Sequence, residues 1–178
     1  MRFTVSEPQL EEGKFASGRG QKRPSELAVS LACAKARDVG LRTRGDRIII
    51  AADTIVVMGS TVIGKPGNKQ DAGRILKLLS GKTHKVITGV CMLELPGGAS
   101  RSFPVTTMVS MINMTNADIR WYIGTGEPMD KAGAYGIQGL GGQFVRKISG
   151  SYTNVVGLPI AEVIEGLRKL GLPFPCCT

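Results

Sequence analysis

Apolar residues along this 178-residue chain gather into blocks that predict strands alternating with helices. The stretch 47–58 (RIIIAADTIVVM) is β-branched and almost continuously apolar, which is typical of a strand buried on both faces. Gly-Ser and Pro-Gly-Gly turns predict two hairpins, one after residue 58 and one after residue 95. The expected strands are 47–58, 61–63, 83–95, 101–114 and 144–148, with a further strand-like piece around Phe3 and Val5.

Helix signals separate these strands. Pro24 and Ser25 begin an expected helix that Gly40 ends; Asn68 caps a second helix, and Thr115 with Asp118 starts a third. The expected helices are 24–39, a segment between 68 and 81, 115–123 and 160–170, with a glycine-dense loop at 126–142 and an irregular segment at 150–159. Because a hairpin interrupts the strand–helix alternation, we expect an α/β fold with a mixed rather than purely parallel sheet.

Size and composition narrow the class of protein. A mass of 18.9 kDa fits one domain, or one domain with two lobes around a cleft, and 42% hydrophobic residues suffice for a core. No apolar run approaches the roughly 18–20 residues that span a bilayer, and the start of the chain lacks a secretory pattern. Four cysteines without a CxxC pair and a single histidine argue against a structural metal site. We therefore expect a cytoplasmic protein with reduced cysteines.

The net charge of +9 indicates an anionic partner. Nearly half of the Lys and Arg residues lie before Ile48. Such a bias suits nucleic acid or phosphorylated small molecules. Aromatic residues make up only 5%, which leaves little for stacking single-stranded bases. The charge alone decides for neither partner.

Asp53 is the most informative single residue, because an ionised carboxylate inside an apolar strand is costly unless a cation compensates it. Its neighbour Thr54 offers a hydroxyl group. Lys65 follows the expected hairpin, which would return it alongside Asp53, where an ammonium group could hold phosphate oxygens. The alternatives are a buried Asp that hydrogen-bonds to a turn and a solvated turn lysine.

Two further segments carry candidate chemistry. Glu11 and Glu12 could hold a divalent cation against phosphate, or form a solvated acidic loop. The segment 126–142 is rich in glycine, which lets backbone amides approach an anion, and it carries Lys131 and Gln138. The sequence has no Walker or GxGxxG pattern. We expect a structural role for His84, since no acid or nucleophile is placed beside it in the sequence.

Several blocks, in order along nearly the whole chain, resemble the Maf family of nucleoside triphosphate pyrophosphatases. They are Ala52-Asp53-Thr54, Gly64-Lys65-Pro66, LSGKTH at 79–84, TGV at 88–90, TGEP at 125–128, DKAGAYGIQG at 130–139 and GSYTNVVGLP at 150–159. The resemblance implies a Maf/ITPase-like fold, a mixed twisted sheet flanked by helices with two lobes around a central cleft. It also implies hydrolysis of a nucleoside triphosphate to the monophosphate and pyrophosphate. The KAGAYGIQG block is similar to the branch that acts on dTTP and UTP and removes surplus or non-canonical nucleotides.

The resemblance also implies site roles. Asp53 would accept a proton from the attacking water and help to hold a divalent cation, Mg²⁺ or alternatively Mn²⁺ or Co²⁺. Glu12 would be a second metal ligand, with Glu11 one register away. Thr54 and Gln138 would set base specificity, and Lys65 and Lys131 would contact phosphate. These roles agree with phosphoryl chemistry, which depends on positioning and charge neutralisation.

One departure bears on activity. The family opens with a strand and a Ser-x-Ser-Pro-Arg-Arg loop that contacts the triphosphate, and we expect residues 1–178 to form a single Maf-like domain without them. Members commonly pair, so we expect a homodimer. The alternative function is a catalytically silent relative that binds nucleic acid or a cell-division partner, because the family's name is linked to septum formation.

Overall fold

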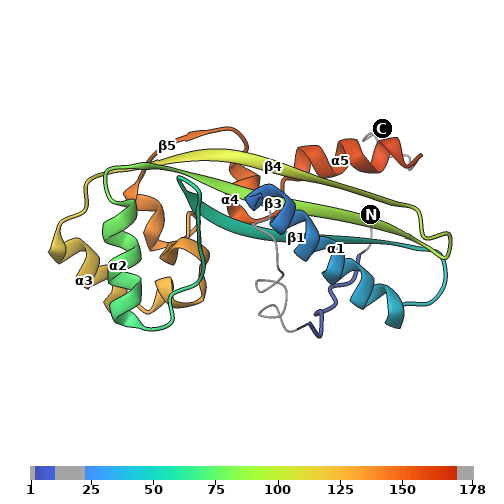
Figure 1. Cartoon of the computed structure of the whole chain (residues 1–178), viewed down its shortest axis with the longest axis horizontal. Coiled ribbons are helices and arrows are strands. Elements are labelled where there is room, and N and C mark those ends of the chain that lie inside the picture. The colour runs from blue at the N-terminus through green and yellow to red at the C-terminus, as the bar shows by residue number, and fades with distance from the viewer. Residues whose placement is uncertain (1–2, 11–22, 172–178) are drawn as a thin grey trace. The chain divides into compact units, whose positions relative to one another are not determined.

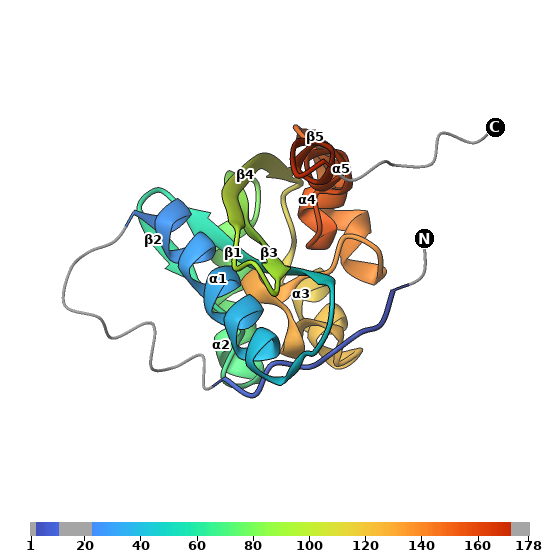
Figure 2. The same ribbon diagram turned by 90° about the vertical axis from the view of Figure 1, so that its right-hand side faces the viewer.

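The computed structural model describes residues 3–10 and 23–171. The α-helices there are α1 (Pro24–Arg42), α2 (Lys69–Leu79), α3 (Asn116–Gly124), α4 (Tyr152–Val156) and α5 (Ile160–Lys169). The strands are β1 (Arg47–Met58), β2 (Thr61–Ile63), β3 (Thr83–Leu95), β4 (Ser100–Met111) and β5 (Val145–Ser149); β2 is labelled in Figure 2 and the other strands in Figure 1. No helix in these two ranges is long and apolar enough to cross a membrane.

The strands form one five-stranded sheet in the order β2-β1-β3-β4-β5. Both edge strands pair antiparallel with their neighbours: Val56 of β1 lies opposite Ile63 of β2, and Val109 of β4 opposite Ile148 of β5. A sheet flanked by helices confirms the predicted α/β class, and the antiparallel edges confirm that the sheet is not purely parallel.

The described chain divides into two compact units. The first contains the chain up to Asp53, Gly89–Pro104 and the chain from Ile160 onward. The second contains Thr54–Thr88 and Val105–Pro159. Strands β1, β3 and β4 contribute residues to both units, and the boundary in β1 falls between Asp53 and Thr54.

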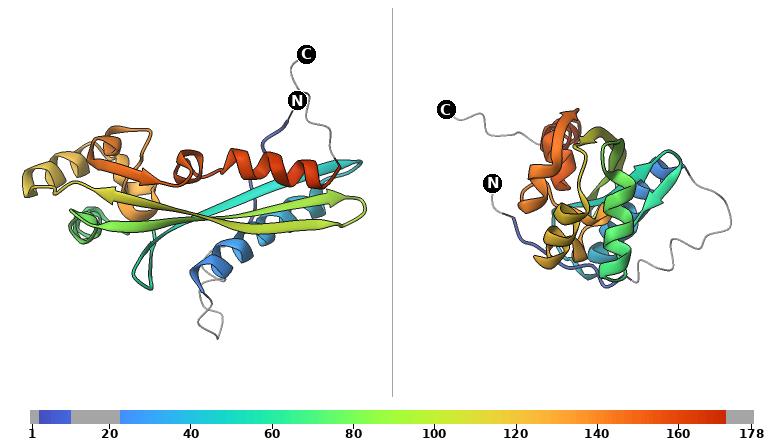
Figure 3. Two further views of the ribbon diagram at one scale, coloured as in Figure 1. Left: turned by 90° about the horizontal axis from the view of Figure 1, so that it is seen from above. Right: turned by 90° about the vertical axis from the view of Figure 1, so that its left-hand side faces the viewer.

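In the first unit, helices α1 and α5 cover opposite faces of the sheet (Figures 2 and 3). Cys91 of β3 packs in a cluster with Ala32 and Ala36 of α1, whereas the next residue, Met92, packs with Val163 and Leu167 of α5. Side chains alternate between the faces of a strand, which accounts for this division. Helix α1 comes so close that a Cβ added to Gly89 would lie 2.2 Å from the backbone carbonyl carbon of Ala28. Only glycine permits this approach.

The second unit has the larger core. Helices α2 and α3 pack side by side, and Ile75, Leu76 and Leu79 of α2 are buried in one cluster with Tyr122 of α3. His84 of β3 is 1% exposed, and its Nε2 lies 2.8 Å from the hydroxyl of Tyr135. Burial lowers the pKa of His84 to about 4, so the ring is neutral at pH 7. The burial of His84 and its contact with Tyr135 place it in the core of the second unit, where the expected structural role stays a prediction.

Some predicted boundaries were wrong. Helix α1 continues through Gly40 to Arg42, because the glycine packs against Leu93 and Ile49 instead of adopting a left-handed turn. Residues 3–10 form no strand; the Gln9 amide and Glu7 carbonyl are instead bonded to Asp38 and Arg42 of α1. Strand β4 ends at Met111 after an irregularity in its pairing with β5. The expected irregular segment contains α4, and the glycine-dense loop contains three 3₁₀ turns, Glu127–Asp130, Ala132–Ala134 and Leu140–Phe144.

The buried His84 makes stability depend on pH. Its folded pKa of about 4 lies below the unfolded value of 6.5, so the unfolded chain binds the extra proton between these values. The free energy of unfolding should fall by roughly 3 kcal/mol as the pH is lowered from about 7 to 4. Chemical denaturation at several pH values in this window measures the change.

His84→Gln is the matched variant, because an amide can still hydrogen-bond to Tyr135 but does not titrate. The variant should be less stable at pH 7 and lose less stability on acidification, with the remaining loss coming from carboxyl groups at lower pH. Since His84 is the only histidine in the sequence, equal slopes for both proteins would contradict a neutral buried ring.

Candidate active site

Asp53 lies in β1 and forms an ion pair within the first unit. Its Oδ1 accepts a hydrogen bond from Lys35 Nζ of α1 at 2.5 Å, and the side chains are 11% and 18% exposed. The ammonium group compensates the charge of a carboxylate that lies in an apolar strand. Lys35 is therefore a partner of the predicted site residue Asp53, and the sequence analysis did not identify it. In the sequence, Lys35 is recognisable only as a lysine on a helix with a face of small residues, and this pattern is common on protein surfaces.

Thr54 begins the second unit and is held by a chain of hydrogen bonds. Its hydroxyl lies 2.8 Å from that of Thr88, which donates to the Asn154 carbonyl at 3.1 Å. Asn154 is fully buried, and its side-chain amide donates to the Val86 carbonyl and the Thr107 hydroxyl. The α4 segment thus fixes the orientation of the Thr54 hydroxyl group.

A pocket of about 400 Å³ lies within the second unit. Thr54, Lys65, Lys131 and Gln138, four of the predicted site residues, line it together. Lys65 reaches it because β2 pairs with the end of β1 and the chain leaves the hairpin at Gly64, whose carbonyl accepts the Gly133 amide. The remaining lining is mainly apolar side chains and backbone from the glycine-dense segment. This pattern is typical of a small-molecule site, with few polar groups on an apolar wall.

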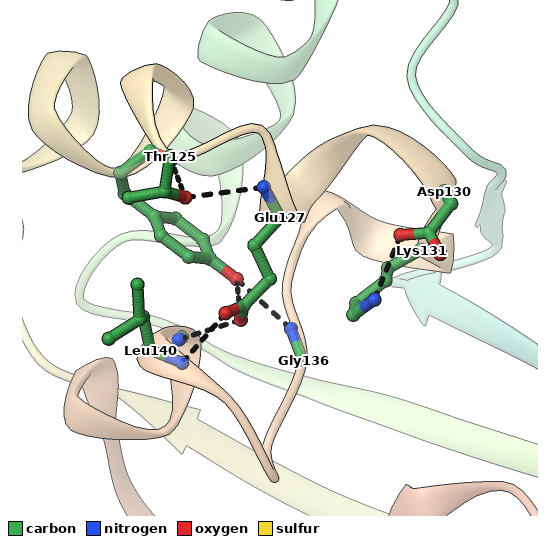
Figure 4. Close-up of polar contacts among 8 residues, drawn as sticks. Thr125, Glu127, Asp130, Lys131, Gly136 and Leu140 are labelled. Atoms are coloured by element: carbon green, nitrogen blue, oxygen red, sulfur yellow. Dashed lines mark hydrogen bonds and ion pairs between the residues drawn. The ribbon is translucent and has the colours of Figure 1, made fainter.

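The charges in this pocket are partly paired (Figure 4). Lys131 Nζ contacts Asp130 Oδ1 at 2.8 Å, and the Asp130 side chain is 77% exposed. The hydrogen bond from Lys131, together with the charges of Lys131 and Lys65, lowers the pKa of Asp130. An exposed pair of this kind is weak and exchanges easily. An anionic ligand can therefore replace Asp130 as the partner of Lys131.

The glycine-dense segment is held by Glu127, whose carboxylate accepts from the Tyr122 hydroxyl at 2.8 Å (Figure 4). The same carboxylate accepts the backbone amides of Leu140 at 2.8 Å and Gly141 at 3.0 Å. The Tyr122 hydroxyl in turn accepts the Gly136 amide at 3.1 Å. The pocket residue Gln138 lies between these attachment points. Glu127 and Tyr122 were not among the predicted site residues.

The structure thus brings together Thr54, Lys65, Lys131 and Gln138, and places Asp53 with Lys35. Glu12 and Glu11 lie outside the described residues. Within the parts that are described, no group of three or more His, Cys, Asp or Glu side chains could hold a metal ion. Of the two predicted metal ligands, the structure describes Asp53, whose carboxylate oxygens are donors of the kind that a hard divalent cation prefers.

A double-mutant cycle with Lys35→Met and Asp53→Asn tests the ion pair. Each single variant leaves one largely buried charge without this partner, whereas the double variant removes both, so the free energies of unfolding should couple by about 1–2 kcal/mol. Urea denaturation measures the four proteins.

Arg42 and Asp38 of α1 supply the control, since they form an i,i+4 pair with a more exposed arginine. Arg42→Met and Asp38→Asn should couple clearly more weakly, because solvent screens an exposed pair. A coupling for Lys35 and Asp53 as small as that of the control would show that the pair does not stabilise the fold.

Comparison with known proteins identifies the family of this chain. Residues 1–170 match the family described as "Maf: Maf-like protein". A dTTP/UTP pyrophosphatase of Alkaliphilus metalliredigens is 53% identical over 146 residues, 82% of this chain and 76% of the relative. That of Anaeromyxobacter dehalogenans is 46% identical over 154 residues (85% and 77%), and that of Carboxydothermus hydrogenoformans is 44% identical over 170 residues (96% and 88%). The chain belongs to the Maf family.

Proposed function

We propose that this chain is a nucleoside triphosphate pyrophosphatase, a hydrolase that converts dTTP and UTP to the monophosphate and pyrophosphate. Its relatives at 44–53% identity carry the name dTTP/UTP pyrophosphatase. The observation that carries the assignment in this molecule is the pocket lined by Lys65, Lys131, Gln138 and Thr54. The pocket combines two ammonium groups, which can bind a phosphate chain, with a side-chain amide and a hydroxyl group, which can hydrogen-bond to the edge of a base.

Asp53 is the proposed proton acceptor. The Lys35 ammonium holds the Asp53 side chain through an ion pair, and a carboxylate in this place can take a proton from water. The resulting hydroxide attacks the α-phosphorus, the α–β anhydride bond breaks, and pyrophosphate leaves with the bonding electrons. Lys35 is in this scheme a positioning residue, which holds the Asp53 carboxylate in one orientation.

Lys65 and Lys131 are the proposed phosphate ligands. Negative charge increases on the phosphate oxygens as the anhydride bond breaks, and fixed ammonium groups stabilise it. Lys131 exchanges Asp130 for phosphate when the substrate enters, which removes one charge pair and forms another. Gln138 and Thr54 are the proposed base-reading residues, and Thr54 is already oriented by Thr88.

A divalent cation is the proposed cofactor, Mg²⁺ or alternatively Mn²⁺ or Co²⁺, with Asp53 and Glu12 as its protein ligands. When bound, such an ion neutralises phosphate charge and polarises a coordinated water. The homodimer, the cytoplasmic location, the role in clearing surplus nucleotides and the single-domain organisation stay predictions.

Pyrophosphate release from a panel of nucleotides with Mg²⁺ or Mn²⁺ tests the function. The chain should turn over dTTP and UTP, and Asp53→Asn should reduce kcat by about 100-fold or more, because the amide cannot accept the proton. Asp46→Asn is the matched control, an exposed acid in the turn before β1, and it should retain full activity.

A folded wild-type protein that releases no pyrophosphate from any nucleotide would overturn the proposal. If that protein instead binds DNA or RNA with strong salt dependence, the silent nucleic-acid-binding relative becomes the better description.

A further inference from the structure

Glu127 has an environment unlike that of an ordinary surface acid. Three donors converge on its carboxylate: the Tyr122 hydroxyl and the backbone amides of Leu140 and Gly141. A carboxylate accepts several hydrogen bonds and donates none when ionised, so this donor set fits the charged form. Burial raises the pKa of Glu127, but the two amides, the Tyr122 hydroxyl and the charge of Lys131 together lower it below its usual value.

A side chain on the glycines near Glu127 would displace Glu127 or Lys131 from their present positions. A Cβ added at Gly139 would lie 2.4 Å from Glu127 Oε2, and one at Gly136 would lie 2.7 Å from Lys131 Cε. The glycines of this segment therefore allow the chain to wrap closely around the carboxylate and the lysine stem. The carboxylate, in turn, determines where that chain runs.

The segment attached in this way is one wall of the pocket. Gly136, Ile137, Gln138 and Gly139 line it. Tyr122 holds this stretch at Gly136, and Glu127 holds it just beyond, at Leu140 and Gly141. Both ends of the short segment that carries Gln138 are therefore bonded to one Tyr–Glu pair (Figure 4).

We infer that Glu127, together with Tyr122, is a positioning residue for base selectivity, which sets the backbone of residues 136–141 so that Gln138 meets the base of the nucleotide. This inference rests on the proposed function. Neither residue touches the phosphate chain in this scheme, so their loss changes which base is accepted more than it changes the chemical step.

A merely structural role predicts a different result. If Glu127 only stabilised the fold, a substitution would lower the fraction of folded enzyme and reduce turnover of every nucleotide equally. The ratio of kcat/KM between two nucleotides is independent of the folded fraction. Selectivity between a pyrimidine and a purine therefore separates positioning from stability.

The experiment compares kcat/KM for dTTP and dATP in wild type, Glu127→Gln and Tyr122→Phe. In E127Q the side-chain amide accepts hydrogen bonds at one atom only and turns its NH₂ group toward a backbone donor. The dTTP-to-dATP ratio should fall about tenfold or more in E127Q, mainly through KM for dTTP. Tyr122→Phe removes the hydroxyl group that donates to Glu127 and accepts the Gly136 amide. The dTTP-to-dATP ratio should fall about threefold to tenfold in this variant.

Glu165→Gln is the matched control, an exposed acid on α5 in the first unit, and it should keep the wild-type ratio. A wild-type ratio in E127Q overturns the inference, even if the variant is less active. The affinities of dTMP and dAMP, measured by calorimetry, give a second measure of base selectivity that does not require turnover. If wild type binds dTMP selectively but releases no pyrophosphate, the proposed activity fails while the inference is still decided by E127Q.

Discussion

The first unit of this molecule must accommodate a carboxylate inside an apolar strand, and the ion pair between Lys35 and Asp53 compensates that charge. Strand β1 must contribute apolar residues to the core and also present a carboxylate, and the ammonium group of α1 reconciles these two demands. Lys35 lies about two helical turns beyond Ala28, the residue whose backbone Gly89 accommodates. The close approach of α1 to β3 thus determines where along the helix an ammonium group can reach β1. Small residues on α1 and a glycine on β3 are part of the site, although they carry no chemistry.

The second unit positions its polar groups by a different principle. Much of its pocket is lined by the long connecting segment 130–139, beside residues of β1, β3 and α4. That segment obtains its conformation from hydrogen bonds to buried or half-buried side chains. Asn154 fixes the region around Thr54 through Val86 and Thr107, and Glu127 fixes the region around Gln138 through backbone amides. In both places one polar side chain satisfies several donors or acceptors at once. Such networks specify a single geometry because leaving any member unpaired is costly.

The charged side chains of the pocket are paired weakly, which favours the exchange of a protein partner for a ligand over the stability of the fold. Lys131 is bonded to an exposed Asp130, a pair that contributes little to folding, so that an incoming phosphate can replace the carboxylate at small cost. Lys35, in contrast, is bonded to a largely buried Asp53. The two lysines therefore differ in their surroundings: Lys35 is paired with a largely buried carboxylate, and Lys131 with an exposed one.

Local patterns in the sequence determined much of this protein. The apolar run of β1, the caps at Asn68 and Thr115 and the motifs around Asp53, Lys65 and Gln138 identified the elements, the family and four residues of one pocket. These signals are short-range, because helix caps, turns and strand patterns act within a few residues. Sequence reasoning missed Lys35, Tyr122 and Glu127, since most of their partners lie 13 to 18 residues away, and several of these partners are backbone amides, which almost every residue possesses. Only the tertiary structure decided those contacts, because a hydrogen bond across such a distance forms only after packing has brought the two segments together.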